Sequence, residues 1–201
     1  MVLVVFAREY RAVVHALKVI SGAEVTKVRP RKVKGGVLLY EVRLGEKVQL
    51  TISEECHRSG ICEDIPDFPE KEVDDIIDKL LSDKVHFNQD AEVKESRIKE
   101  AYDLCELRPT LFRPKAVRDV NYQWYVVLNS NSFGVQKFRG ELCLGGHGAP
   151  CSRLIYFNNP FHGECVQLFE NRNMLVLSTD FKQVLLKPMA VPMCCSCMAV
   201  T

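Results

Sequence analysis

The chain has 201 residues, of which 47% are apolar, and its 27 basic and 26 acidic side chains give a formal net charge of +1. The length accommodates one medium domain or two small ones, and the ordinary composition excludes wholesale disorder and fibrous repeats. The longest apolar run near the N-terminus, residues 2–7, is far too short to span a bilayer.

The near-neutral total hides three differently charged segments. Residues 1–60 carry 11 basic and 6 acidic side chains (net +5), residues 61–104 carry 6 and 14 (net −8), and residues 105–201 carry 10 and 6 (net +4). Two interpretations of the acidic segment stay open. It is a solvated face, or it pairs electrostatically with the basic part until it is removed.

The first half of the chain contains two helical patterns. Residues 7–20 suit a short amphipathic helix, residues 27–36 a basic loop, and residues 37–52 one or two strands. A clearer helix is expected from about residue 69 to 82, after the start signal Asp67-Phe68-Pro69. Its apolar positions follow one helical face: Val73, Ile76, Ile77, Leu80 and Leu81. Residues from about 83 to 97 are polar, lose this period and indicate a linker.

Beyond Cys105 the patterns are those of strands. Residues 122–128 are aromatic and β-branched, residues 129–132 form a turn, and residues 133–143 return as a second strand. Residues 165–178 and 181–186 indicate another strand pair around Thr179-Asp180. The second half is therefore predicted to be mostly β.

Nine cysteines stand out, because seven of them lie in the last 97 residues. Packing of reduced cysteines does not explain three of them within the last eight residues. Structural zinc requires paired Cys-x2-Cys or His-x3–5-His spacings, which the cysteines and histidines do not show. We therefore expect neither a metal nor a cofactor.

A disulfide framework in a secreted protein fits the spacings better. Cys195 and Cys197 project from one face of a strand, so their thiols can bond to the two ends of the segment 143–151. A third bridge, between Cys105 and Cys165, could pass through the resulting ring. Spacing alone does not give the connectivity, because six cysteines allow 15 pairings.

Three further cysteines lie outside these six. Cys194 points to the opposite face of its strand and is left unpaired, which suggests an intermolecular bond. Cys56 and Cys62 are expected to pair with each other across a short loop at Ser59-Gly60.

Several motifs together resemble one known family. They are the early Cys105, the Trp124-centred strand followed by Asn129, the Glu141-Leu142-Cys143 to Pro150-Cys151 pair, the isolated Cys165 and the closing Pro192-Met193-Cys194-Cys195-Ser196-Cys197. These residues resemble the Spätzle family of secreted cystine-knot ligands, which are similar in fold to neurotrophins. Upstream, residues 62–69 look like the end of the pro-region of that family, so the resemblance covers roughly residues 56–200.

The resemblance implies a fold, a pairing and an activity. The fold is a cystine-knot domain of elongated hairpins after a loosely structured pro-region with one or two short helices. The implied pairs are Cys105–Cys165, Cys143–Cys195 and Cys151–Cys197, with Cys194 joining two copies into a homodimer. The implied activity is that of a ligand which a serine protease releases from its precursor and which binds the ectodomain of a Toll-type receptor.

A cleavage site of this kind lies in the polar linker. A trypsin-like protease is expected to cut after Arg97 and leave Ile98 as the new N-terminus. The chain would then consist of a pro-region, residues 1–97, and a ligand domain, residues 98–201. A signal peptide is not evident in residues 1–7, so for a secreted, extracellular protein we expect a truncated N-terminus.

Other functions have weaker support in the sequence. Motifs of hydrolases, nucleotide-binding loops and metal enzymes are absent, so we expect no enzyme. We also expect no nucleic-acid partner and no membrane insertion. An extracellular structural or matrix cystine-knot protein stays open as the alternative, and a zinc-binding intracellular protein is a weaker one. A cystine-knot domain has a small core, so some of its apolar side chains are expected to be exposed and available for receptor contact. The candidates are Trp124, Tyr125, Phe133, Tyr156 and Phe157.

Overall fold

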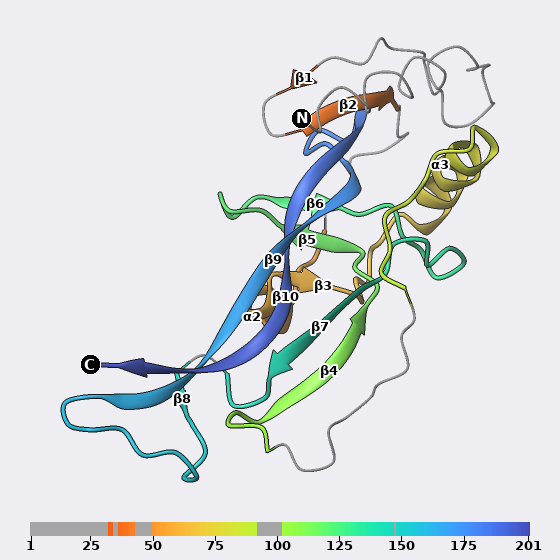
Figure 1. The fold of residues 1–201 in the computed structure, drawn as a ribbon. Coiled ribbons are helices and arrows are strands. Elements are labelled where there is room, and N and C mark those ends of the chain that lie inside the picture. The colour runs from red at the N-terminus through yellow and green to blue at the C-terminus, as the bar shows by residue number, and fades with distance from the viewer. Residues whose placement is uncertain (1–31, 34–35, 43–49, 92–101, 147) are drawn as a thin grey trace, which may run out of the picture. The chain divides into compact units, whose positions relative to one another are not determined.

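The computed structural model describes residues 32–33, 36–42, 50–91, 102–146 and 148–201 (Figure 1). The described residues are mostly β, as predicted. Two helices are described, α2 (Glu54–Ser59) and α3 (Glu70–Ser82). The strands are β1 (Lys32–Val33), β2 (Gly36–Glu41), β3 (Ile61–Cys62), β4 (Leu107–Phe112), β5 (Ala116–Arg118), β6 (Trp124–Val126), β7 (Phe138–Cys143), β8 (Ala149–Pro150), β9 (His162–Leu177) and β10 (Gln183–Val200). The helix expected at 7–20 lies outside the described residues.

The strands form three antiparallel sheets. One has the order β1-β2-β10-β9-β8, the second β3-β5-β6 and the third β4-β7. The long strands β9 and β10 are neighbours on either side of the predicted turn at Thr179-Asp180 (Figure 1). The carboxylate of Asp180 accepts hydrogen bonds from the Ser178 hydroxyl and the Lys182 N–H in this turn, and these bonds lower the pKa of Asp180.

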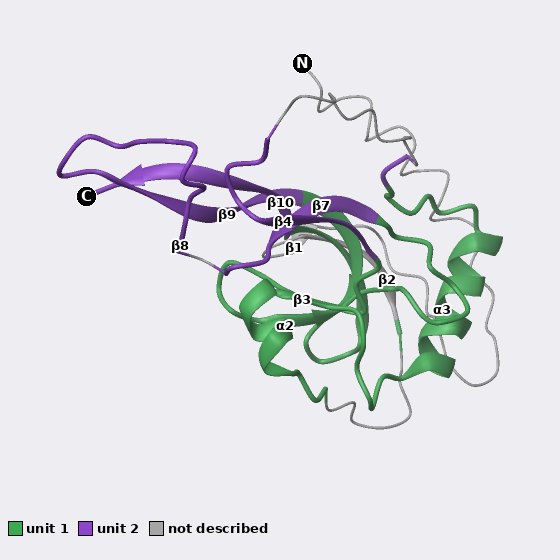
Figure 2. Ribbon diagram, turned by 90° about the horizontal axis from the view of Figure 1, so that it is seen from below, with its two compact units in different colours: residues 1–89, 113–137, 172–190 green, residues 90–112, 138–171, 191–201 purple. Residues whose placement is uncertain are grey.

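The chain divides into two compact units (Figure 2). Unit 1 comprises residues 1–89, 113–137 and 172–190, and unit 2 comprises residues 90–112, 138–171 and 191–201. Each unit combines residues from both sides of position 97, so neither follows a division of the chain at that point.

Unit 1 is organised around the apolar face of α3. Val73, Ile76, Ile77 and Leu80 are each at most 1% exposed. They belong to one cluster with residues from the second half of the chain: Ala116, Val126, Leu128, Leu175, Leu177 and Val184. Burying one such side chain contributes roughly 1.5–3 kcal/mol. The helix is therefore held in place by tertiary packing more than by its own hydrogen bonds.

The start of α3 differs from the sequence expectation in one detail. Pro69 occupies the cap position without a side-chain cap, and the helix begins at Glu70. The Asp67 carboxylate accepts a hydrogen bond from the Thr51 hydroxyl instead. Glu70 and Glu72 in the first turn lie at the positive end of the helix dipole, which favours this start.

Strand pairing and charge tie residues 54–89 to the later part of unit 1. β3 pairs with β5, with Ile61 opposite Val117. The Glu70 carboxylate binds the Lys115 ammonium through one oxygen and accepts the Asn131 N–H through the other. Acidic residues of the first half therefore do contact a basic residue of the second half, within one compact unit.

The hairpin expected from residues 122–128 and 133–143 does not form. β6 pairs with β5, and β7 pairs with β4. Two buried side chains close the intervening loop. The Asn129 side chain donates to the Pro114 and Gln136 carbonyls and accepts the Gln136 N–H, and the Gln136 side chain donates to the Leu128 and Leu175 carbonyls. Side-chain hydrogen bonds thus replace the backbone ladder that the alternating pattern predicts.

Unit 2 contains the β4-β7 ribbon, in which each of the six residues of β4 has a partner in β7. Gly140 in this ribbon lies against the backbone carbonyl of Pro192 in β10. A Cβ atom at position 140 would overlap that oxygen and touch the Phe112 ring at 3.0 Å. The close approach of two backbones explains why glycine is required here.

We therefore expect Gly140→Ala to destabilise the protein by at least about 1–3 kcal/mol, because the obstructing atom is backbone and does not rotate away. Gly134→Ala is the matched control, since the nearest atoms to its Cβ are side-chain atoms at 3.7 Å. The measurement is thermal unfolding of both variants with the disulfides intact. Equal melting temperatures for the two variants would contradict the packing described.

Candidate functional site

Two disulfides close a small ring in unit 2. Cys143 at the end of β7 is bonded to Cys195, and Cys151 after β8 is bonded to Cys197, with Cα–Cα distances of 5.2 and 5.8 Å. Both distances lie within the ordinary range for disulfides. The ring consists of residues 143–151, residues 195–197 and the two bridges.

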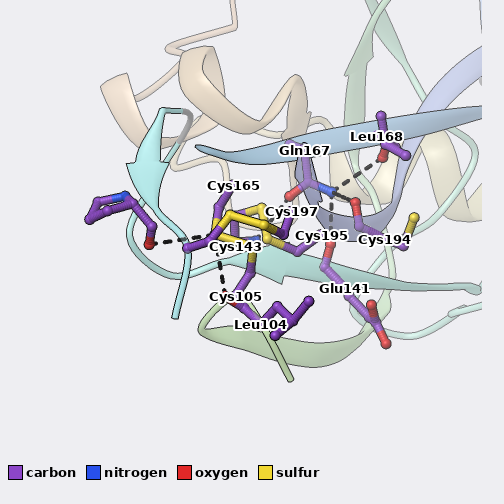
Figure 3. Close-up of a disulfide and its surroundings, with 12 residues drawn as sticks. Leu104, Cys105, Glu141, Cys143, Cys165, Gln167, Leu168, Cys194, Cys195 and Cys197 are labelled. Atoms are coloured by element: carbon purple, nitrogen blue, oxygen red, sulfur yellow. Dashed lines mark hydrogen bonds between the residues drawn. A yellow bond between two sulfur atoms is a disulfide. The ribbon is translucent and has the colours of Figure 1, made fainter. Parts of the chain in front are cut away.

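The third bridge lies against this ring (Figure 3). Cys105 is bonded to Cys165, both side chains are buried, and the sulfur atoms of Cys105, Cys151 and Cys165 lie within 4.8 Å of one another. The three pairs in the structure are the pairs that the resemblance implies, and the arrangement is a cystine knot. Because each of these three sulfur atoms is part of a disulfide, none of them offers a thiolate to a metal ion.

The three bridges close loops of 46 to 60 residues. By the chain-entropy argument each contributes about 4 kcal/mol before strain. The Cys56–Cys62 bridge in unit 1 closes a loop of only 6 residues and contributes less. It joins α2 to β3, where Gly60 ends the helix with a φ of 75°, a conformation that favours glycine.

One side chain ties the strands around the knot together. Gln167 in β9 accepts the N–H of Cys143 and donates to the carbonyls of Glu141 and Cys194 (Figure 3). This side chain of β9 is thereby bonded to the backbone of β7 and of β10. The sequence showed no signal for this role, because a lone glutamine in a strand carries no pattern.

Cys194 has a free thiol and is half-buried. It is the one cysteine in the described part of the chain outside the four disulfides. Large apolar side chains close to it in sequence or in the same strand pair are exposed to solvent. These are Met193, Met198, Leu168 and Phe169.

The five candidates for receptor contact differ in their exposure to solvent. Tyr156, in the loop between β8 and β9, is 88% exposed. Phe157 next to it is half-buried and folds onto Gly163, where a Cβ atom would overlap its ring. In unit 1, Trp124, Tyr125 and Phe133 are half-buried.

Trp124 is covered on two sides. The His57 ring of α2 meets it edge-on at 5.6 Å, and the Arg118 guanidinium lies 5.9 Å from its centre. Tyr125 lies under the Lys187 ammonium at 4.3 Å, and Phe133 packs against the core cluster of unit 1. The proposed cleavage residues Arg97 and Ile98 lie outside the described residues, as do residues 1–31.

The part of the chain that contains the cystine knot is similar to known proteins. Residues 102–199, which contain all three knot bridges, match the family model described as Spaetzle. This segment belongs to the Spaetzle family. Protein spaetzle 5 of Drosophila melanogaster is 24% identical over 94 residues, which are 47% of this chain and 24% of that protein. The chain thus spans about a quarter of the length of this Spaetzle relative.

Two further observations bear on the environment of the chain. The four disulfides fit an oxidising, extracellular environment. Neither of the helices in the described ranges has the length and apolar character that crossing a bilayer requires.

The role of Gln167 is testable by substitution. Gln167→Leu leaves the Cys143 N–H and two carbonyls without partners, so we expect it to lower the free energy of unfolding by roughly 1–3 kcal/mol. Gln89→Leu is the control, because Gln89 is exposed and should change stability by less than about 0.5 kcal/mol. Urea unfolding under non-reducing conditions measures both. Equal stabilities would show that Gln167 does not hold the strands.

Proposed function

We propose that the chain is a secreted, protease-activated ligand that acts as a disulfide-linked homodimer and binds the ectodomain of a Toll-type receptor, and that it is not an enzyme. The observation that carries this proposal is a Spaetzle-family cystine knot with one free cysteine, Cys194, beside it. Its proposed partners are a second copy of this chain, an activating trypsin-like serine protease and the receptor.

We further propose that residues 1–97 are a pro-region and residues 98–201 the ligand domain. Each described disulfide joins two cysteines on the same side of residue 97. After a cut there, no described disulfide would link the pro-region to the ligand domain. Contacts of the first part with the second would then be non-covalent. They include the apolar face of α3, the β3–β5 pairing and the Glu70–Lys115 ion pair.

The contacts of α3 support a shielding role for the pro-region. Its apolar face covers Val126, Leu128, Leu175 and Leu177, and all four of these residues belong to the proposed ligand domain. Removal of the pro-region would expose them to water or to a partner. The acidic segment is therefore proposed to act as a cover as well as a solvated face.

The cleavage proposal predicts the masses of the products. Trypsin-like proteolysis of the oxidised full chain should give, after reduction, fragments 1–97 and 98–201 by mass spectrometry, and Arg97→Gln should abolish this cut. Lys94→Gln and Lys99→Gln are the matched controls and should be cut like the wild type. If the wild type and Arg97→Gln were both cut first at the same other position, Arg97 would be excluded as the processing site.

The dimer proposal predicts the effect of removing one thiol. The wild type should migrate as a dimer without reductant and as a monomer with it, whereas Cys194→Ser should be a folded monomer under both conditions. Its unfolding temperature should stay close to that of the wild type, because Cys194 is outside the knot. Loss of folding in Cys194→Ser would instead place this cysteine in the knot, and a persisting covalent dimer would assign the link to another residue.

A receptor-binding measurement distinguishes a ligand from an extracellular structural protein. The cleaved dimer should bind at least one member of a panel of immobilised Toll-type receptor ectodomains, as surface plasmon resonance would show, and the uncleaved chain should bind more weakly. A cleaved, folded dimer that binds none of them would favour an extracellular structural role.

A further inference from the structure

The turn between β5 and β6, residues 119–123, presents apolar side chains to solvent. Val120 is 79% exposed and Tyr122 is 76% exposed. Tyr122 has a φ of 61°, a left-handed conformation that favours glycine or asparagine and is unfavourable for a bulky residue. Core packing explains neither the exposure nor the choice of tyrosine at this position.

A buried ion pair fixes the conformation of this turn. One oxygen of the Asp119 carboxylate accepts the N–H groups of Asn121 and Gln123 at 2.9 and 3.0 Å. The other oxygen binds the Lys187 ammonium at 2.7 Å, and the two side chains are 5% and 9% exposed. The turn is closed further by backbone bonds from Tyr122 N–H to Asp119 and from Asp119 N–H to Gln123.

The charge state of Asp119 suits this role. Burial by itself would raise the pKa of Asp119, but the hydrogen bonds from Lys187, Gln123 and Asn121 outweigh it and hold the pKa below the ordinary value. The carboxylate is therefore ionised at neutral pH. The turn is rigid before any partner arrives, which reduces the entropy lost on binding.

A cation lies beside the exposed tyrosine. The Arg118 guanidinium is 5.0 Å from the centre of the Tyr122 ring and 5.9 Å from that of Trp124. Among the described residues, Arg118 has no ion-pair partner. Tyrosine, tryptophan and arginine are the residue types that dominate the binding energy of protein interfaces.

The parts of this surface come from a short stretch of the chain. Residues 118–124 and Lys187 all lie after the proposed cut, so the device that fixes the turn is independent of the pro-region. Within unit 1 the proposed pro-region touches this surface at two places, because the His57 ring meets Trp124 and the Gly60 carbonyl accepts the Arg118 N–H. Val120 and Tyr122 are exposed in the uncut chain as well.

We propose that the β5–β6 turn is a preformed protein-docking site, at which Val120 and Tyr122 enter an apolar pocket of the partner and Arg118 pairs with a carboxylate at its rim. The inference rests on the proposed function in one respect, namely that this partner is the Toll-type receptor ectodomain. Complementary charge assigns the carboxylate, since Arg118 has no acidic partner among the described residues and the Lys187 charge is already neutralised by Asp119.

The test uses the cleaved dimer and the receptor ectodomain that binds the wild type most tightly. Tyr122→Asn removes the ring but suits the left-handed backbone, so it should fold normally while its Kd rises at least 30-fold. Tyr102→Asn is the matched control, because Tyr102 is 81% exposed and lies outside the turn, and its Kd should stay within twofold of the wild type. Arg118→Gln should raise the Kd less than Tyr122→Asn does, with a smaller dependence on salt than in the wild type.

A second variant separates positioning from contact. Asp119→Asn/Lys187→Met removes the buried ion pair without leaving a lone charge. It should raise the hydrogen-exchange rate of the Asn121 and Gln123 amides and weaken binding, whereas Tyr122→Asn should weaken binding with unchanged exchange. Binding within twofold of the wild type for Tyr122→Asn would overturn the proposal and leave the proposed function standing. Absence of binding by the wild type to every ectodomain would overturn both.

Discussion

The covalent ring of Cys143–Cys195 and Cys151–Cys197 holds unit 2 together, because this unit buries few apolar side chains. Its described residues include six buried apolar ones, and two of these are bonded to each other. They are Cys105, Phe112, Phe138, Cys165, Val191 and Pro192. Most of the exposed large apolar residues are also in unit 2, including Tyr156, Phe169 and Met193. A ribbon of this kind gains its order from cross-links that restrict the unfolded chain, in place of a large core.

Unit 1 follows the opposite principle. Its core cluster joins residues from before and after position 97, and α3 supplies four of its most buried side chains. Hydrolysis of one peptide bond after Arg97, as proposed, would by itself remove none of these contacts. Activation by a cut after Arg97 would instead lower the effective concentration of the first segment near its binding surface, so that a competing partner can displace it.

Local periodicity and cysteine spacing could be read from the sequence, whereas distant pairings could not. The residues of α3 repeat at helical spacing, and Cys195 and Cys197 alternate on a strand, so both features depend on neighbours along the chain. The Asp119–Lys187 pair joins residues 68 positions apart, and α2 is too short to show a period. The expected hairpin of residues 122–143 failed for a related reason. The Asn129 side chain bonds the backbone of Gln136, and the Gln136 side chain bonds the backbone of Leu128 and Leu175, which a polar/apolar pattern does not record.

Gln167 has a consequence for how the oxidised protein is made. The chain has nine cysteines to pair during oxidative folding, and even six of them can pair in 15 ways. Gln167 holds the backbone at Cys143 and at Cys194 at the same time. Because neighbouring strand residues point to opposite faces, the strand that Gln167 fixes directs the Cys195 side chain toward Cys143 and the Cys194 side chain away from it. A single uncharged amide thus fixes the backbone beside two adjacent cysteines, of which Cys195 is bonded to Cys143 and Cys194 keeps a free thiol.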